Sequence, residues 1–256
     1  MSGHVRIDVR REFSACVSKM GGTVNDDVLA ARPDNKPNAD FVFAADDVVA
    51  ELKCLETDWA AELAAHAPAR TDDWMRRGKL RRMSGSISLE DLPLPLVREI
   101  LEPFRKRLKS RIVARAAKQI KQSRLDIARP SAKGLLIIVN DGNRALAPDM
   151  MAPLLLPILN SGSYSAIHTV LYMSVNEPVT VGGPFGQAQF WMPWSIKGKE
   201  SVSQDFVDRL GDAWMAHLSS VTGDPVFQLS STVSIEKMQF AAAERQHRYS
   251  RLICRA

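Results

Sequence analysis

Residues 40–55 read Asp-Phe-Val-Phe-Ala-Ala-Asp-Asp-Val-Val-Ala-Glu-Leu-Lys-Cys-Leu and contain two short apolar runs, at 40–44 and 48–55. Both runs include β-branched or aromatic side chains, and the segment between them is as short as a tight turn requires. The pattern therefore predicts a β-hairpin. Asp46 and Asp47, in the short segment, are interpreted as turn residues.

Three charged side chains of the hairpin form a pattern that suits metal binding. Asp40 opens the first strand, and Glu51 and Lys53 lie on the second. Because strand side chains alternate, Glu51 and Lys53 point to the same face. Two carboxylates on neighbouring strands can hold a hard cation such as Mg²⁺, and a lysine beside them would supply positive charge for a scissile phosphate or an attacking water. The same residues would also fit an edge strand that faces solvent, with Asp40 in a turn.

Helical and strand patterns surround the hairpin. Residues 5–20 have apolar side chains every three or four positions and end at Gly21-Gly22, which predicts an amphipathic helix. A helical pattern at 57–82 is broken by Pro68 and Gly78, and a longer helix is predicted at 96–127. The remaining predicted elements are strands at 134–139, 166–175 and 187–194 and helices at 148–159, 204–219 and 241–251. The strands on either side of the helix at 148–159 imply a parallel pair.

The order of these elements predicts an α/β protein with a central mixed sheet flanked by helices. Residues 176–256 would form a C-terminal strand and helix extension that packs on the same domain. A length of 256 residues and a hydrophobic content of 45% suit such a globular chain.

The composition favours an intracellular protein. Cys16, Cys54 and Cys254 lie far apart and lack Cys/His metal spacing, so neither a disulfide framework nor a zinc site is indicated. Residues 1–11 are polar and charged where a secretory signal would need an apolar segment, and no apolar run reaches about 18 residues. We therefore expect a soluble cytoplasmic protein without a membrane span.

Positive charge is concentrated in one segment of the chain. The formal net charge is +5, but residues 70–124 contain sixteen Lys or Arg against six Asp or Glu. Such a cluster can follow the phosphate backbone of a nucleic acid, or it can be a helix face exposed to water. The candidate nucleic-acid-binding residues are Arg105, Lys109, Arg111, Arg115, Lys118 and Lys121.

Asp40 together with Glu51-Leu52-Lys53 resembles the metal-binding motif of the PD-(D/E)xK nuclease superfamily. The order of elements is also similar to the restriction-endonuclease-like core of that family: a helix, strands that carry the Asp and the Glu-x-Lys, a second helix and a further strand, within residues 5–139. The resemblance implies that residues 1–175 form the nuclease-like core, with a helical insertion at about 57–95. The segment Pro37-Asn38-Ala39-Asp40 departs from a literal Pro-Asp, a departure that the family often tolerates. The resemblance implies that Asp40, Glu51 and the Leu52 backbone carbonyl bind Mg²⁺ or Mn²⁺ and that Lys53 is the catalytic lysine.

The resemblance also implies two accessory positions and a function. Some members use a glutamate of the first helix, here Glu12, and others a glutamine or basic residue of the following helix, here Gln119 or Lys118. The implied activity is metal-dependent hydrolysis of phosphodiester bonds, with DNA as the expected substrate and a homodimer where both strands of a duplex are cut. The main alternative is a non-catalytic protein of the same fold that binds nucleic acid or a partner through the basic helix. A third is an interaction protein whose charged helices face water.

Overall fold

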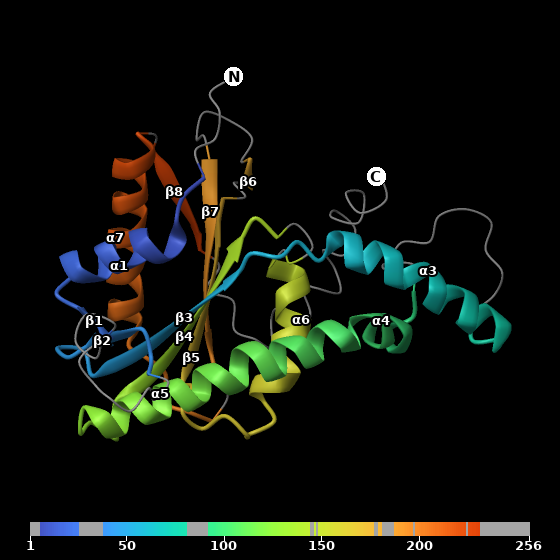
Figure 1. Ribbon diagram of the computed structural model, residues 1–256, viewed down its shortest axis with the longest axis horizontal. Helices are drawn as coiled ribbons and strands as arrows, with labels where there is room; N and C mark the ends of the chain where they lie inside the picture. The colour runs from blue at the N-terminus through green and yellow to red at the C-terminus, as the bar shows by residue number, and fades with distance from the viewer. Residues whose placement is uncertain are drawn as a thin grey trace.

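The computed structural model describes residues 6–25, 38–80, 92–143, 146, 148–176, 179–180, 187–196, 198–223 and 225–230. These residues form an α/β fold in which one mixed sheet lies between two groups of helices, so the expected class is confirmed (Figure 1). The described strands are β1 (Thr23–Val24), β2 (Phe41–Phe43), β3 (Val48–Leu55), β4 (Lys133–Asp141), β5 (Thr169–Val175), β6 (Val179–Thr180), β7 (Gln187–Ser195) and β8 (Val226–Ser230). The described helices are α1 (Val9–Lys19), α3 (Ala60–Arg76), α4 (Leu94–Arg107), η2 (Leu108–Val113), α5 (Ala114–Asp126), α6 (Pro148–Leu159) and α7 (Gln204–Thr222).

β2 and β3 form the predicted hairpin. They pair in antiparallel orientation, with Phe41 opposite Ala50 and Phe43 opposite Val48. The turn contains Asp47 with a φ of 52°, a left-handed conformation that aspartate adopts more readily than most residues. β1 adds a short antiparallel strand on the outer side of β2.

β3, β4 and β5 form the parallel centre of the sheet. β4 lies between the other two and pairs in parallel with both, as the predicted strand–helix–strand unit requires for β4 and β5. Every residue of β4 from Gly134 to Asp141 is buried. A glycine is needed at the start of this strand, because a Cβ on Gly134 would lie 2.0 Å from the carbonyl oxygen of Ala166.

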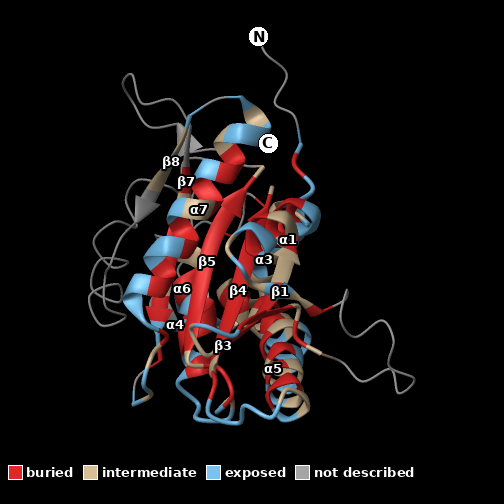
Figure 2. Ribbon diagram, turned by 90° about the vertical axis from the view of Figure 1, so that its left-hand side faces the viewer, coloured by how far each residue is buried: buried red, intermediate tan, exposed pale blue. Residues whose placement is uncertain are grey.

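Helices cover both faces of the sheet (Figure 1), and its central strands are buried (Figure 2). Each face has its own hydrophobic core. α1 and α7 pack against each other and cover one face. α4, η2, α5 and α6 contribute to the core on the other face. Leu52 points into the core of α1 and α7, whereas Val49 and Leu55 point to the opposite side. Glu51 and Lys53 alternate with Leu52 along β3, so they point toward α5.

α4, η2 and α5 follow one another without a gap and form the long basic helix that the sequence predicted at 96–127. Its middle part, η2, is a π-helical segment of six residues that the periodicity did not predict. α3 continues through Pro68 and ends before Gly78, so the expected break at Pro68 is wrong. A proline removes one backbone donor from a helix, and the seventeen-residue α3 tolerates that loss.

The described part of the C-terminal extension belongs to the same sheet. β7 pairs in antiparallel orientation with β5, and both β6 and β8 pair with β7. α7 then covers the face that α1 also covers. The helix predicted at 241–251 lies outside the described residues. No helix within the described ranges combines the length and the apolar character needed to cross a membrane.

Candidate metal centre

Asp40 and Glu51 lie beside each other where β2 begins. Asp40 precedes Phe41, whose partner on β3 is Ala50, so the antiparallel register places Asp40 next to Glu51. The Asp40 N–H donates to Glu51 Oε2 (3.2 Å), and the Leu52 N–H donates to Asp40 Oδ2 (2.7 Å). The two carboxylates therefore accept backbone hydrogen bonds from the two neighbouring segments and are fixed close together.

Glu51 is deeply buried, with 1% of its surface exposed. Its pKa is raised from 4.5 to about 7, mainly by burial and also by the negative charge of Asp40, although Lys53 opposes the change. The raised pKa means that the positive charge around Glu51 does not fully offset the cost of burying its ionised carboxylate beside Asp40. A divalent cation next to both carboxylates would supply the missing charge.

Lys53 contacts both Glu51 and the long basic helix. Its Nζ forms an ion pair with Glu51 Oε1 and donates to Gln119 Oε1 on α5 (2.9 Å). Gln119 is itself held because its Nε2 donates to the Asn38 carbonyl (2.9 Å). Of the two residues considered on this helix, Gln119 reaches the site, whereas Lys118 is exposed to solvent.

The Leu52 carbonyl and an arginine of α1 complete the cluster. The carbonyl accepts a hydrogen bond from Arg10 Nη2 (3.5 Å), and Arg10 Nη1 lies 3.7 Å from Asp40 Oδ1. Arg10 is the second residue of α1, and its side chain is 55% exposed. Sequence patterns gave no signal for Arg10, because a charged residue near the start of an amphipathic helix is ordinary.

Glu12, the expected accessory residue of the first helix, lies in a different set of contacts from Asp40 and Glu51. It faces α7, where its Oε2 pairs with His217 Nε2 (2.9 Å), and its Oε1 binds Arg11. The hydrogen bond with His217 has the largest share in lowering the pKa of Glu12. Lys19 Nζ contacts the other ring nitrogen of His217 (3.1 Å). Glu12 therefore joins α1 to α7.

The donor atoms of the cluster suit Mg²⁺ or Mn²⁺. Mg²⁺ is usually bound by one or two carboxylates and keeps several waters, so Asp40, Glu51 and the Leu52 carbonyl are an adequate set. This set includes a backbone oxygen. In the part of the chain that the structure describes, no group of three or more His, Cys, Asp or Glu side chains is arranged to hold a metal. The buried Glu51 with its raised pKa is the observation that fits a cation here.

Comparisons with protein-family models, curated proteins and solved structures found no match. The roles of Asp40, Glu51 and Lys53 are therefore inferred from their contacts and their burial.

Exposed basic side chains lie along η2 and α5, the segments of the long basic helix that lead to and include Gln119. The exposed candidates are Lys109, Arg111, Arg115, Lys118 and Lys121. Arg105 is half-buried and donates two hydrogen bonds to Glu102, of 2.7 and 2.9 Å. At about 100° per residue, Arg115 and Lys118 lie about 40° and 100° around α5 from Gln119, on the side away from the buried face. The basic stripe thus lies next to the glutamine that holds Lys53.

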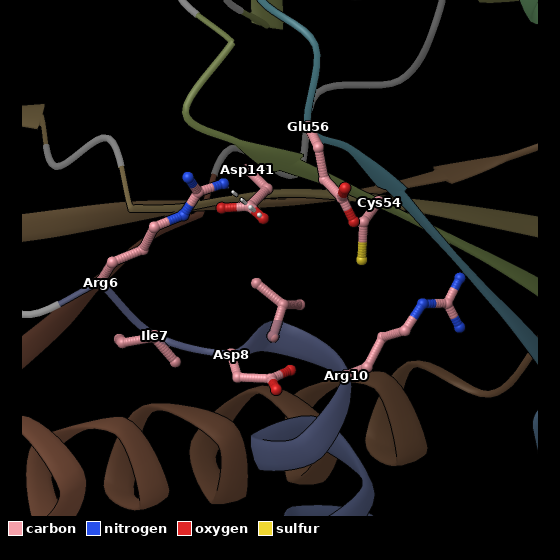
Figure 3. Close-up of a pocket in the computed structure, with 8 residues that line it drawn as sticks. Arg6, Ile7, Asp8, Arg10, Cys54, Glu56 and Asp141 are labelled. Carbon is pink, nitrogen blue, oxygen red and sulfur yellow. Dashed lines mark ion pairs between the residues drawn. The ribbon is translucent and has the colours of Figure 1, made fainter.

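A cavity of about 350 Å³ opens beside Arg10. Its walls are the first turn of α1 with the residues before it and the carboxyl ends of β3 and β4 (Figure 3). Asp141 on this wall pairs with Arg6 (3.5 Å) and accepts a hydrogen bond from Asn176 Nδ2 (2.6 Å). Asn176 also binds the N–H and the carbonyl of Ile7, at 2.7 and 2.9 Å. The chain before α1 is therefore fixed against the ends of β4 and β5.

Proposed function

We propose that this protein is a divalent-metal-dependent nuclease that hydrolyses phosphodiester bonds in DNA. The observation that carries the proposal is the meeting of Asp40, Glu51 and Lys53 at one end of the hairpin, where Glu51 is buried and its pKa is raised to about 7. Two close carboxylates, a carbonyl oxygen and a lysine are groups that metal-assisted phosphodiester hydrolysis uses.

Asp40, Glu51 and the Leu52 carbonyl would hold one Mg²⁺ or Mn²⁺ ion. The bound ion supplies a Lewis acid for a phosphate oxygen and lowers the pKa of a coordinated water. Asp40 is held by the Leu52 N–H and Glu51 by the Asp40 N–H. Because backbone donors orient both carboxylates, little reorganisation of these two side chains would be needed for binding.

Lys53 would assist the attack of water on the phosphate. Its ammonium group lies between Glu51 and Gln119, so its positive charge is fixed at the site. A fixed positive charge stabilises the negative charge that develops on the attacking oxygen and the phosphate in the transition state. Gln119 acts as a positioning residue, because it is held by the Asn38 carbonyl and in turn orients Lys53.

The exposed basic stripe of η2 and α5 would bind the sugar–phosphate backbone. Each phosphate that a lysine or arginine neutralises releases counterions, so binding should weaken steeply with salt. Contacts to phosphates carry no direct sequence information, so this stripe should bind many sequences alike. Its position next to Gln119 would bring the backbone close to Lys53.

The order of elements supports a restriction-endonuclease-like core. α1, the strands β1 to β3, the helix α5 and the strand β4 follow one another, with α3 and α4 inserted between β3 and α5. β3, which carries Glu51 and Lys53, pairs in parallel with β4. The same order and the same Asp/Glu-x-Lys pattern are typical of the PD-(D/E)xK superfamily that the sequence resembles.

Cleavage assays with the purified protein test the proposal. Double-stranded DNA, single-stranded DNA and RNA are incubated with Mg²⁺ or Mn²⁺, and in parallel with EDTA. We expect metal-dependent cleavage of DNA that Asp40→Asn and Lys53→Ala each reduce by about 100-fold or more. The control Lys79→Ala, which removes a lysine paired with Glu99, should leave cleavage unchanged. If every substrate stays uncut and Lys53→Ala behaves like the parent, catalysis by this site is wrong.

A non-catalytic nucleic-acid-binding protein of the same fold is the second candidate, and the exposed basic stripe favours it equally. This candidate predicts DNA binding in EDTA that falls steeply with salt and is unchanged by Asp40→Ala. Fluorescence anisotropy measured with and without metal distinguishes it from the nuclease. We also propose that a homodimer would supply two sites where both strands of a duplex are cut, which sedimentation in the presence of DNA would reveal.

A further inference from the structure

Arg10 occupies the side of the candidate metal centre that faces α1. One guanidinium group bridges Asp40 Oδ1 (3.7 Å) and the Leu52 carbonyl (3.5 Å), which are two of the three groups proposed as metal ligands. Both contacts are longer than the usual charge-assisted hydrogen bond of about 2.7–2.9 Å. The side chain is also 55% exposed, so these contacts are weak and can be exchanged for others.

We propose that Arg10 is an exchangeable cation. It binds the metal ligands in the metal-free protein, and it binds the scissile phosphate when a divalent ion occupies those ligands. A guanidinium and Mg²⁺ would compete for Asp40 and the Leu52 carbonyl, because the two cations repel each other and draw on the same oxygen atoms. The inference rests on the proposed nuclease function and adds a substrate-binding residue to the same site.

The displaced guanidinium stays within reach of the site because the backbone that carries it is fixed. Asp8 Oδ1 caps α1 by accepting the Arg11 N–H (3.1 Å), and Asn176 holds Ile7 just before it. Arg10 therefore moves through its side chain alone. Arginine binds phosphate through two parallel hydrogen bonds, and a phosphate held by a divalent ion at Asp40 and Glu51 would present oxygens on this side.

The cavity beside Arg10 would give the displaced guanidinium room to move, and its lining also includes the carboxylates of Asp8, Glu56 and Asp141. Figure 3 shows Arg10 at the edge of the cavity, with its guanidinium directed toward β3 and away from Asp141 and Arg6. Neighbouring arginines are already engaged: Arg6 pairs with Asp141, and Arg11 pairs with Glu12.

Calorimetric titration of the metal-free protein with Mg²⁺ tests the exchange directly. Arg10→Gln should bind Mg²⁺ about fivefold more tightly than the wild type, because it removes a competing surface ion pair. Arg11→Gln, which removes the same charge at the next position, should match the wild type. At saturating Mg²⁺, Arg10→Gln should cleave DNA with a kcat/KM at least about tenfold lower, because a charged phosphate contact is lost. A purely structural role would instead weaken metal binding and cleavage together.

The outcomes separate this inference from the function on which it rests. Equal Mg²⁺ affinity in the wild type and Arg10→Gln, with binding lost in Glu51→Gln, would overturn the exchange and keep the metal centre. Tighter Mg²⁺ binding by Arg10→Gln with undiminished cleavage would overturn its role at the phosphate. If Glu51→Gln binds Mg²⁺ as well as the wild type, the metal centre itself is wrong, and the inference fails with it.

Discussion

Glu51 should make the metal-free protein less stable as the pH rises, and Glu51→Gln should remove this effect. The pKa of the carboxyl is raised from 4.5 to about 7, because it is buried and lies near Asp40. The folded protein therefore holds the proton more tightly than the unfolded chain does. The stabilisation from the protonated form is fully present below pH 4.5 and is lost as the pH rises through about 7.

The size of the effect follows from the two pKa values. One pKa unit corresponds to about 1.4 kcal/mol, so the difference between 4.5 and about 7 corresponds to about 3 kcal/mol. Glutamine keeps the length of the side chain and an oxygen that accepts the Asp40 N–H, without a buried charge. We expect Glu51→Gln to raise the free energy of unfolding by about 2–3 kcal/mol at pH 8 and by less than about 1 kcal/mol at pH 5.

Urea unfolding in EDTA, followed by tryptophan fluorescence, measures these free energies at both pH values. Glu56→Gln, a change at an exposed glutamate just beyond β3, should shift them by less than about 0.5 kcal/mol. Mg²⁺ at about 100 times its Kd should stabilise the wild type by about 2.7 kcal/mol and leave Glu51→Gln unchanged. An equal gain at both pH values, or a Glu51→Gln protein that is less stable than the wild type at pH 8, would refute the reasoning.

Three further changes test other parts of the structure. Replacing Arg115 and Lys118 together by alanine should weaken DNA binding for all sequences. The slope of log K against log salt, measured by fluorescence anisotropy, should fall in magnitude by about 2. An unchanged slope would exclude the two residues from the interface. Glu12→Gln should lower the free energy of unfolding by about 1–3 kcal/mol, because it weakens the hydrogen bond to His217 on α7, and should leave DNA cleavage intact. Loss of cleavage in a folded variant would instead indicate that Glu12 belongs to the active site. Gly134→Ala should lower the stability by more than about 3 kcal/mol, and a normal thermal melt would contradict the packing of β4 on the Ala166 carbonyl.

Local patterns in the sequence were sufficient for the hairpin and for its charged face. The turn and the strand residues lie within a few positions of one another, and the two-residue period of a strand requires Glu51 and Lys53 to share a face, as their ion pair confirms. The parallel pair of β4 and β5 also followed from short patterns, an unbroken apolar run and a helix between two strands. Short patterns did not predict the π-helical segment η2 or the continuation of α3 through Pro68, because the spacing of apolar residues is insensitive to both.

The side chains that reach the hairpin from elsewhere were selected by packing. Gln119 is 66 residues from Lys53, and Arg10 is 42 residues from Leu52, so no local rule relates them. Arg10 and Glu12 are two residues apart on α1 and lie about 200° apart around it, so they point in nearly opposite directions. The helical period determines this separation. Only the packing of α1 between the hairpin and α7 places Arg10 beside Asp40 and Glu12 beside His217.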